Sequence, residues 1–388
     1  MKDYKSLYSH FLNARPAELH FAAHSHHFWP DVTREAQLQE WDDAARFNDR
    51  KWEHIFETIV PSVQKHIAQI LNIKDHEQIA LAPNTHDLLV RLFSELLTRP
   101  RLNLTTTDSE FHSFGRQLKR WQEVYPQLAV TRVSTEKLLT DRNGFLSELA
   151  DSIRQSDVVF ISQVFFNSGL ALSSAEIETL VSHAAPSTVF IVDGYHGFAA
   201  LPTDLSRLEG RIFYLGGGYK YAQAGEGVGF MLVPQGAWRP VVTGWFSEFA
   251  ELSAPSQHAV AYAKNGMAFW GATLNPTGWY RFKATWDLFA RLGLTVDAIH
   301  AHVQTLQRQF IHEVQLADEL TGLFQKPLPE CHGHFLTFSA PSAEKAEALR
   351  KTWAQRGVYI DLRGTRLRFG IGLYHGPQDI KELSIKLS

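Results

Sequence analysis

Short runs of β-branched and aromatic residues alternate with helical stretches between about residue 78 and residue 290 of this 388-residue chain. Such alternation is typical of an α/β fold, in which a mostly parallel sheet carries helices on both faces. Two of the runs are followed by residues of opposite charge. Asp193 follows residues 188–192, and Lys220 comes shortly after residues 211–217. Ligands bind at the carboxyl ends of the strands in such sheets. We therefore expect Asp193 and Lys220 to share one site.

A carboxylate and an amine at this edge of a sheet suit pyridoxal phosphate. The lysine amine forms a Schiff base with the cofactor aldehyde, and the aspartate keeps the pyridine nitrogen protonated so that the ring accepts electrons. A surface lysine and an unrelated strand-end aspartate would give the same two-residue pattern. The residues around the pair therefore decide between the two interpretations.

Those residues resemble the cofactor core of the kynureninases, which belong to the class V aminotransferase branch of the fold-type I pyridoxal-phosphate enzymes. The matching segments are Asp193-Gly-Tyr-His196, Gly218-Tyr-Lys-Tyr221, the glycine-rich residues 225–229 and Leu367-Arg-Phe-Gly370. They follow the order of the family. The resemblance implies a mostly parallel sheet sandwiched by helices, plus a smaller α+β domain.

The region after the alternating segments predicts that smaller domain. Apolar residues recur at spacings of 3 and 4 across residues 292–320, which predicts one long helix. Strands and helices of a small α+β unit are then expected up to the C-terminus. The resemblance implies that an N-terminal arm completes this unit. The expected division is an arm at residues 1–50, a large cofactor-binding domain at 51–300 and a small domain at 301–388.

A strand, a tight turn and a helix are expected across residues 78–93, and Asn84 and Thr85 lie at the turn. The first turn of a helix offers free backbone N–H groups and a positive dipole end to a phosphate. Either side chain could instead simply cap the helix. Because the resembling family binds its phosphate at this turn, we expect Asn84 and Thr85 to bind the cofactor.

The resemblance assigns five further residues to the cofactor. Phe111 would stack on the pyridine face, where an aromatic ring contributes on the order of 1 kcal/mol beyond buried area. His196 would support the ring, and Tyr219 would contact the phosphate and relay protons. Trp245 and Asn275 resemble residues that one subunit lends to its partner's site, which implies a homodimer with shared active sites.

An amino-acid substrate needs a fixed cation for its α-carboxylate, and the planar guanidinium of arginine matches a carboxylate with two hydrogen bonds. The resemblance places this residue at Arg368. The N-terminal arm departs from the family, because the usual Asn-Ser-Leu-Gly is replaced around residues 24–28 and only Ser25 is retained. We expect Ser25 and His26 to border the substrate side chain, and this departure leaves the substrate open.

Two other chemistries each fit a single feature of the chain. The histidines at positions 24, 26 and 27 could suggest a metal, but no carboxylate or cysteine stands at ligand spacing, so no metal is expected. Cys331 could suggest the thiolate nucleophile of a cysteine desulfurase. It stands where the chain enters a predicted strand, which is a poor position for a mobile nucleophile.

The amino-acid composition indicates which kinds of partner and which cellular compartment to expect. Lys and Arg number 38 against 41 Asp and Glu, giving a net charge of −3, so neither a nucleic acid nor a membrane surface is an expected partner. The single cysteine fits a reducing cytosol, and the N-terminus lacks the apolar segment of a secretory signal. We expect a cytoplasmic protein that acts on a small molecule.

The leading hypothesis is a kynureninase-like hydrolase that cleaves the Cβ–Cγ bond of kynurenine or a related β-acyl amino acid. A class V aminotransferase or β-lyase would use the same cofactor residues, and a regulatory module that binds the cofactor without turnover is a third hypothesis. The chain keeps all three family residues Asp193, Lys220 and Arg368, which argues against a regulatory module without turnover. Hydrolysis and transamination remain open, because both use the same electron sink.

Overall fold

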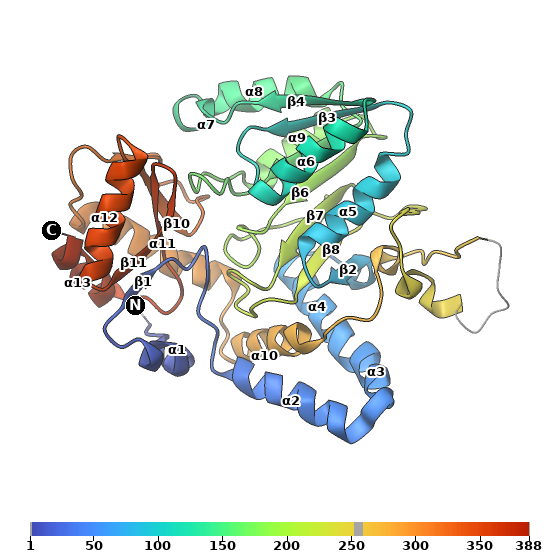
Figure 1. Cartoon of the computed structure of the whole chain (residues 1–388), viewed down its shortest axis with the longest axis horizontal. Coiled ribbons are helices and arrows are strands. Elements are labelled where there is room, and N and C mark those ends of the chain that lie inside the picture. Colours follow the sequence, from blue (N-terminus) through green and yellow to red (C-terminus); the bar gives the residue numbers. More distant parts are fainter. Residues whose placement is uncertain (1, 252–258, 388) are drawn as a thin grey trace.

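The computed structural model describes residues 2–251 and 259–387. In this part of the chain, seven strands form one sheet in the order β2-β8-β7-β6-β5-β3-β4 (Figure 1). These strands are β2 (Ile79–Ala82), β3 (Leu102–Thr107), β4 (Leu128–Val133), β5 (Val158–Ser162), β6 (Val189–Asp193), β7 (Ile212–Gly217) and β8 (Gly229–Leu232). All neighbours from β4 to β7 are parallel, and β8 is antiparallel to both β7 and β2. The predicted, mostly parallel sheet is confirmed.

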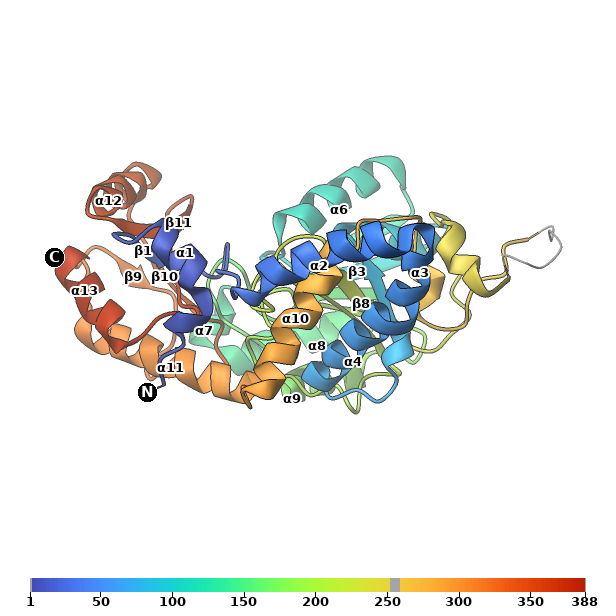
Figure 2. The same cartoon turned by 90° about the horizontal axis from the view of Figure 1, so that it is seen from below.

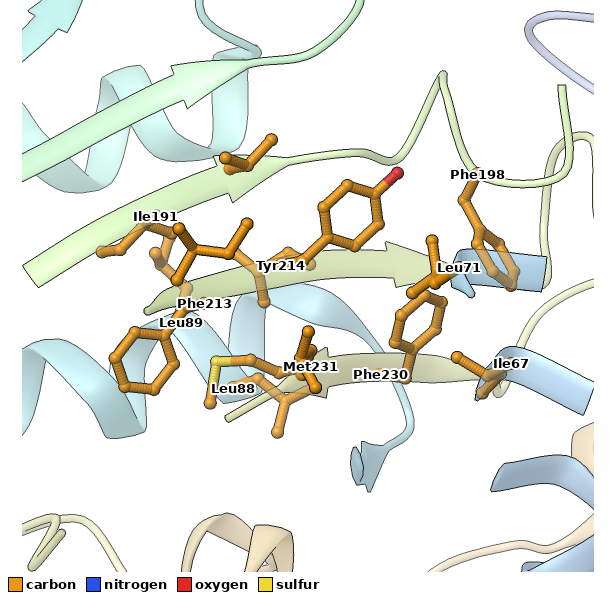
Figure 3. Packing of buried hydrophobic residues seen from close by; sticks show 14 of the residues in the cluster. Ile67, Leu71, Leu88, Leu89, Ile191, Phe198, Phe213, Tyr214, Phe230 and Met231 are labelled. Atoms are coloured by element: carbon orange, nitrogen blue, oxygen red, sulfur yellow. The ribbon is translucent and has the colours of Figure 1, made fainter. Parts of the chain in front are cut away.

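The central strands β5 and β6 are apolar up to their last residues, Ser162 and Asp193, because both of their faces are covered. Every residue of β5 is buried. Figure 3 shows Ile191 of β6, Tyr214 of β7 and Phe230 of β8 among side chains from α4 (Val60–Leu71) and α5 (Thr85–Leu96). This packing holds the carboxyl ends of the strands in fixed positions.

Helices cover the sheet on both sides. Figure 2 shows α6 on one side and α8 and α9 on the other, while α2 packs against α10. The helices of this region are α2 (Val32–Phe47), α3 (Lys51–His54), α6 (His112–Val124), α7 (Lys137–Thr140), α8 (Arg142–Ile153), α9 (Ser174–His183) and α10 (Thr277–Arg291).

A second sheet lies beside the first. Within the described residues it has five strands, in the order β1-β11-β12-β10-β9. They are β1 (Leu19–Phe21), β9 (Thr321–Gly322), β10 (Phe335–Ser339), β11 (Val358–Arg363) and β12 (Arg366–Gly370). The accompanying helices are α1 (Ser9–Ala14), α11 (Val296–Glu313), α12 (Ala343–Gln355) and α13 (Pro377–Leu387). The N-terminal strand β1 pairs in parallel with β11, so the arm joins the C-terminal sheet; the domain boundaries stay a prediction.

The long helix expected at residues 292–320 is wrong at both ends. Helix α11 spans only Val296–Glu313. Gly293 has a φ of +63°, which ends α10 and separates it from α11. Thr295 then caps α11 by accepting a hydrogen bond from the Ala298 N–H at 3.2 Å. The apolar spacing continued past the helix because residues beyond it still pack on the core.

None of the helices within residues 2–251 and 259–387 has the length and apolar character needed to cross a membrane.

Candidate active site

A cavity of about 410 Å³ lies at the carboxyl ends of β5, β6 and β7. Strand ends, the turn before α5 and the start of α6 all contribute to its wall. Seven of the predicted cofactor residues line it, namely Asn84, Thr85, Phe111, Asp193, His196, Tyr219 and Lys220. The fold therefore brings together residues from four distant segments of the sequence.

Asp193 ends β6 in the middle of the sheet. Ser162, Asp193 and Leu215 are aligned across β5, β6 and β7, and Lys220 follows the end of β7. The Asp193 Oδ1 accepts a hydrogen bond from the Tyr195 N–H at 2.9 Å, and no other hydrogen bond reaches this carboxylate within the described residues. Its second oxygen can therefore accept a hydrogen bond from the protonated ring nitrogen of a cofactor.

Burial sets the charge state of Lys220. It lowers the pKa of the Lys220 ammonium to about 7, although the nearby Asp193 carboxylate acts in the opposite direction. Burial raises the pKa of Asp193, while the Tyr195 N–H and Lys220 oppose that rise. Lys220 Nζ contacts His196 Nε2. Burial holds the pKa of His196 well below its usual value, so this imidazole is neutral and can accept a hydrogen bond from the Lys220 ammonium.

The turn before α5 fits a phosphate. Asn84 Oδ1 accepts a hydrogen bond from the Asp87 N–H at 3.0 Å, so Asn84 does cap α5. The same residue also lines the cavity. The Thr85 side chain makes no hydrogen bond within the described residues, so its hydroxyl can donate to a phosphate. A Cβ on Gly229 would lie 2.4 Å from the Asn84 carbonyl carbon, so glycine lets β8 pass close behind the turn.

Aromatic rings enclose the amine of Lys220. Its Nζ lies 5.5 Å from the centre of the Phe111 ring and 5.1 Å from the Tyr195 ring. The Phe166 ring meets Phe111 edge-on at 5.5 Å. A flat cofactor attached to Lys220 could therefore pack against Phe111, as predicted. Tyr195 was missed, although it stands inside the Asp193-to-His196 segment on which the prediction rested.

A buried carboxyl group, Glu110, is also missing from the predictions. It accepts hydrogen bonds from the Thr107 hydroxyl at 2.6 Å and from the Ser162 hydroxyl at 2.5 Å. Burial raises the pKa of Glu110 to about 7, although both hydroxyls oppose the rise. Glu110 thus fixes Ser162, which ends β5 and lines the cavity. The strand-end rule that found Asp193 could have found Ser162 as well.

The loop after Lys220 is held from outside the cavity. Arg281 of α10 donates to the carbonyl oxygens of Ala224 at 2.7 Å and Glu226 at 2.5 Å. Gly225 has a φ of +69°, and a Cβ there would lie 2.4 Å from the Trp29 ring. The close approach of Trp29 therefore requires glycine at this position.

The predicted substrate residues do not line the cavity. His26 meets the edge of the Tyr219 ring at 5.5 Å, which places it at the margin of the site. The Ser25 N–H donates to the Ala22 carbonyl, a turn contact only. Arg368 is buried, and its guanidinium contacts Asp361 and the carbonyl oxygen of Phe166. Phe166 therefore contacts both the cavity and Arg368.

Trp245 and Asn275 also lie outside the cavity of this single chain. The Trp245 side chain is 45% exposed, and Asn275 is exposed on the surface. The Asn275 Oδ1 accepts from the Thr277 N–H at 2.9 Å. One chain alone therefore does not bring these two residues to the cofactor, and their donation to a partner stays a prediction.

Cys331 does not line the cavity, although its neighbour Val164 does. It packs with Val164, Ala171 and Phe335. Burial raises the pKa of the Cys331 thiol to about 11. A thiol that is protonated at neutral pH is a poor nucleophile, because the thiolate is the reactive form. Within the described residues, no three His, Cys, Asp or Glu side chains are grouped so as to hold a metal ion.

Comparison with solved structures shows the fold. The complex of the cystine C–S lyase C-DES with its reaction product cysteine persulfide superposes with a TM-score of 0.82, at 17% identity over 97% of this chain and 98% of that one. A cysteine desulfurase from Thermococcus onnurineus NA1 gives 0.80 at 16% identity, covering 100% and 98%. The cysteine desulfurase CsdA from Escherichia coli gives 0.77 at 17% identity, covering 96% and 94%. At these identities the likeness shows the fold alone.

No curated protein sequence matches the chain. The family model described as aminotransferase class-V matches residues 33–366, which is most of the sequence. The cavity agrees with this match, because it presents an amine, a facing carboxylate, a flat ring and a helix N-terminus to one bound group. The chain therefore belongs to the class-V aminotransferase family, and its cofactor is pyridoxal phosphate.

Proposed function

We propose that this protein is a β-lyase, which breaks a bond to the side-chain β-carbon of an amino acid and releases the leaving group, pyruvate and ammonia. The observation that carries the proposal is the position of Lys220. Its amine lies in the cavity beside Asp193, and its pKa of about 7 leaves much of it unprotonated at neutral pH. It can therefore serve first as a nucleophile and then as a base.

Pyridoxal phosphate supplies an aldehyde for covalent attachment and a ring that withdraws electrons from the substrate Cα. Asp193 would hold a proton on the ring nitrogen, and Thr85 with the α5 N-terminus would hold the phosphate. Lys220 would take the Cα proton, while neutral His196 accepts a hydrogen bond from it. Tyr219, which also lines the cavity, would pass a proton to the leaving group.

We prefer a lyase to a desulfurase because of the environment of Cys331. A desulfurase needs a thiolate at the substrate, and Cys331 is partly buried, has a raised thiol pKa and does not line the cavity. A lyase needs no protein thiol. The solved structures with this fold include a cystine C–S lyase as well as cysteine desulfurases.

A kynureninase-like hydrolase is the second candidate. Phe111 faces Lys220, and Phe166 adds a second aromatic wall, so an aryl ketone side chain would fit there. The family match supports the coarser class and not this substrate. Transamination uses the same residues and is the third outcome of the test below.

A homodimer is also part of the proposal. Val241, Val242, Trp245 and Phe249 leave apolar surface exposed on one segment. A second copy of the chain would cover that surface and would bring Trp245 and Asn275 to a cavity that they do not reach in their own chain. Such a pairing fits their predicted role. We keep the cytoplasm as the proposed location, and a small amino acid as the only expected ligand besides the cofactor.

Product analysis tests the proposal. The purified holoenzyme is incubated separately with cystine and with kynurenine, each with and without a keto acid. Pyruvate and ammonia from cystine without a keto acid support the lyase. Alanine and an aromatic acid from kynurenine would instead support the hydrolase, and turnover that strictly requires a keto acid would support the aminotransferase. Lys220→Ala is the matched control and should release nothing.

A further inference from the structure

The guanidinium of Arg368 is already occupied by its own chain. Its Nη1 donates to the Phe166 carbonyl oxygen at 2.5 Å, and its Nη2 contacts Asp361 Oδ2. Its Nε is buried without a partner, and the residue is 3% exposed. A substrate carboxylate therefore cannot bind Arg368 through both Nη atoms until these contacts change.

The strand pairing fixes this ion pair. Strands β11 and β12 are antiparallel, and Asp361 stands directly opposite Arg368. Directly paired residues project from the same face of a sheet, where opposite charges attract. The contact therefore follows from the register of the hairpin and does not depend on a flexible surface rotamer.

Asp361 has two other partners within reach. His24 Nε2 lies 3.4 Å from Asp361 Oδ2, and Arg363 Nε lies 3.9 Å from the same oxygen. The Asp361 side chain is 14% exposed, whereas that of Arg363 is 48% exposed. A carboxylate that leaves Arg368 would therefore keep a cation beside it, and Arg368 would gain the carboxylate of the substrate. An exchange of this kind leaves no buried charge unpaired.

Phe166 contacts both the cavity and Arg368. It lines the cavity, and its ring centre lies 5.9 Å from Arg368 Cζ. Arg368 itself does not line the cavity. A substrate carboxylate that reaches the guanidinium must therefore displace the Phe166 carbonyl from Nη1 or the Asp361 carboxylate from Nη2.

We propose that Asp361 competes with the substrate α-carboxylate for Arg368 and thereby sets how strongly the site prefers amino acids over simple amines. This inference rests on the proposed function, and on the prediction from the family resemblance that Arg368 binds the α-carboxylate of the substrate. Asp361 is then a specificity-determining residue that does not touch the reacting atoms. Its removal should strengthen carboxylate binding, whereas a purely supporting residue would weaken it.

Calorimetric titration of the holoenzyme with L-alanine and with ethylamine tests the competition. The two probes differ only by the carboxylate, and neither carries a leaving group at its β-carbon. Asp361→Asn should lower the Kd of L-alanine by about tenfold or more, as expected when a charged hydrogen bond becomes available without exchange. The Kd of ethylamine should stay unchanged. Weaker L-alanine binding by Asp361→Asn would overturn the proposal.

Arg363 gives a second variant that keeps the buried pair intact. Arg363→Gln removes one alternative partner of Asp361 and should raise the Kd of L-alanine, again with ethylamine unchanged. Arg366→Gln is the matched control, because Arg366 stands opposite Arg363 and has no ion pair in the part of the chain described. It removes the same charge and should have a smaller effect. Equal effects of the two variants would contradict the competition even if Asp361→Asn did not fold.

Arg368→Gln separates this inference from the function on which it rests. If it weakens L-alanine selectively and Asp361→Asn brings no gain, Arg368 is the carboxylate site and only the competition is wrong. If it leaves L-alanine unchanged, Arg368 is not the carboxylate site, and both the competition and the assumed substrate contact fail.

Discussion

Replacing Arg281 with methionine tests how the structure holds the loop that follows Lys220. Arg281 is buried, and it donates to the carbonyl oxygens of Ala224 and Glu226 and to Gln37 Oε1 at 3.0 Å. Its guanidinium also lies 5.1 Å from the Trp29 ring centre. Methionine keeps much of the apolar length and removes every donor.

The magnitude follows from the groups left unpaired. The buried Ala224 carbonyl that loses its donor costs about 1–3 kcal/mol, and the lost hydrogen bond to the exposed residue Glu226 costs about 1 kcal/mol. The lost contact with Trp29 adds about 1 kcal/mol. We expect the free energy of unfolding to fall by about 4 kcal/mol. Because the loop begins directly after Lys220, the cofactor should also dissociate faster.

Urea unfolding followed by tryptophan fluorescence measures the loss as a lower midpoint. Arg291→Met, at the exposed C-terminal end of the same helix, is the matched control, since Arg291 makes no hydrogen bond or ion pair among the described residues. An Arg281→Met midpoint equal to that of the control would show that the loop does not depend on these hydrogen bonds.

Three further predictions follow from the site. The pKa of Lys220 is about 7 in the folded protein, whereas an unfolded lysine titrates near 10.4. Between these pH values the unfolded chain binds more protons than the folded one, so the apoprotein should become more stable from pH 7 to pH 9. Thermal melts across that range measure the gain in stability, and Lys220→Met should abolish it. Cys331→Ser should leave activity within about twofold of wild type, because the thiol does not line the cavity. Loss of turnover in steady-state assays of this variant would favour the desulfurase hypothesis instead. Mixing inactive Lys220→Ala and Asn275→Ala chains should restore part of the activity in hybrid dimers, and a monomer in sedimentation would rule this out.

Strand-end reasoning found the central part of the site. Asp193 and Lys220 follow apolar runs, and parallel strands carry such residues to one edge, so both reach the same cavity. The same reasoning passed over Ser162, because a serine draws less attention than a charge at a strand end. Phe111 came from the resemblance alone, and it does face Lys220.

The remaining features depend on contacts that no local pattern encodes. The pairing of Asp361 with Arg368 needs the register of two strands, which periodicity does not fix. His24 precedes the predicted substrate residue Ser25 in the arm, yet its side chain is fully buried beside Asp361. The environment of Trp245 depends on a second chain, which a single sequence cannot place.

Borohydride reduction followed by peptide mapping tests the central claim most directly, namely that Lys220 carries the cofactor. The holoenzyme is reduced, digested and analysed by mass spectrometry, with Lys220→Ala as the matched control. We predict that the cofactor mass is found on the peptide that contains Lys220 and is absent from the variant. Cofactor mass on another lysine, or the same adduct in Lys220→Ala, would contradict the assignment of the site.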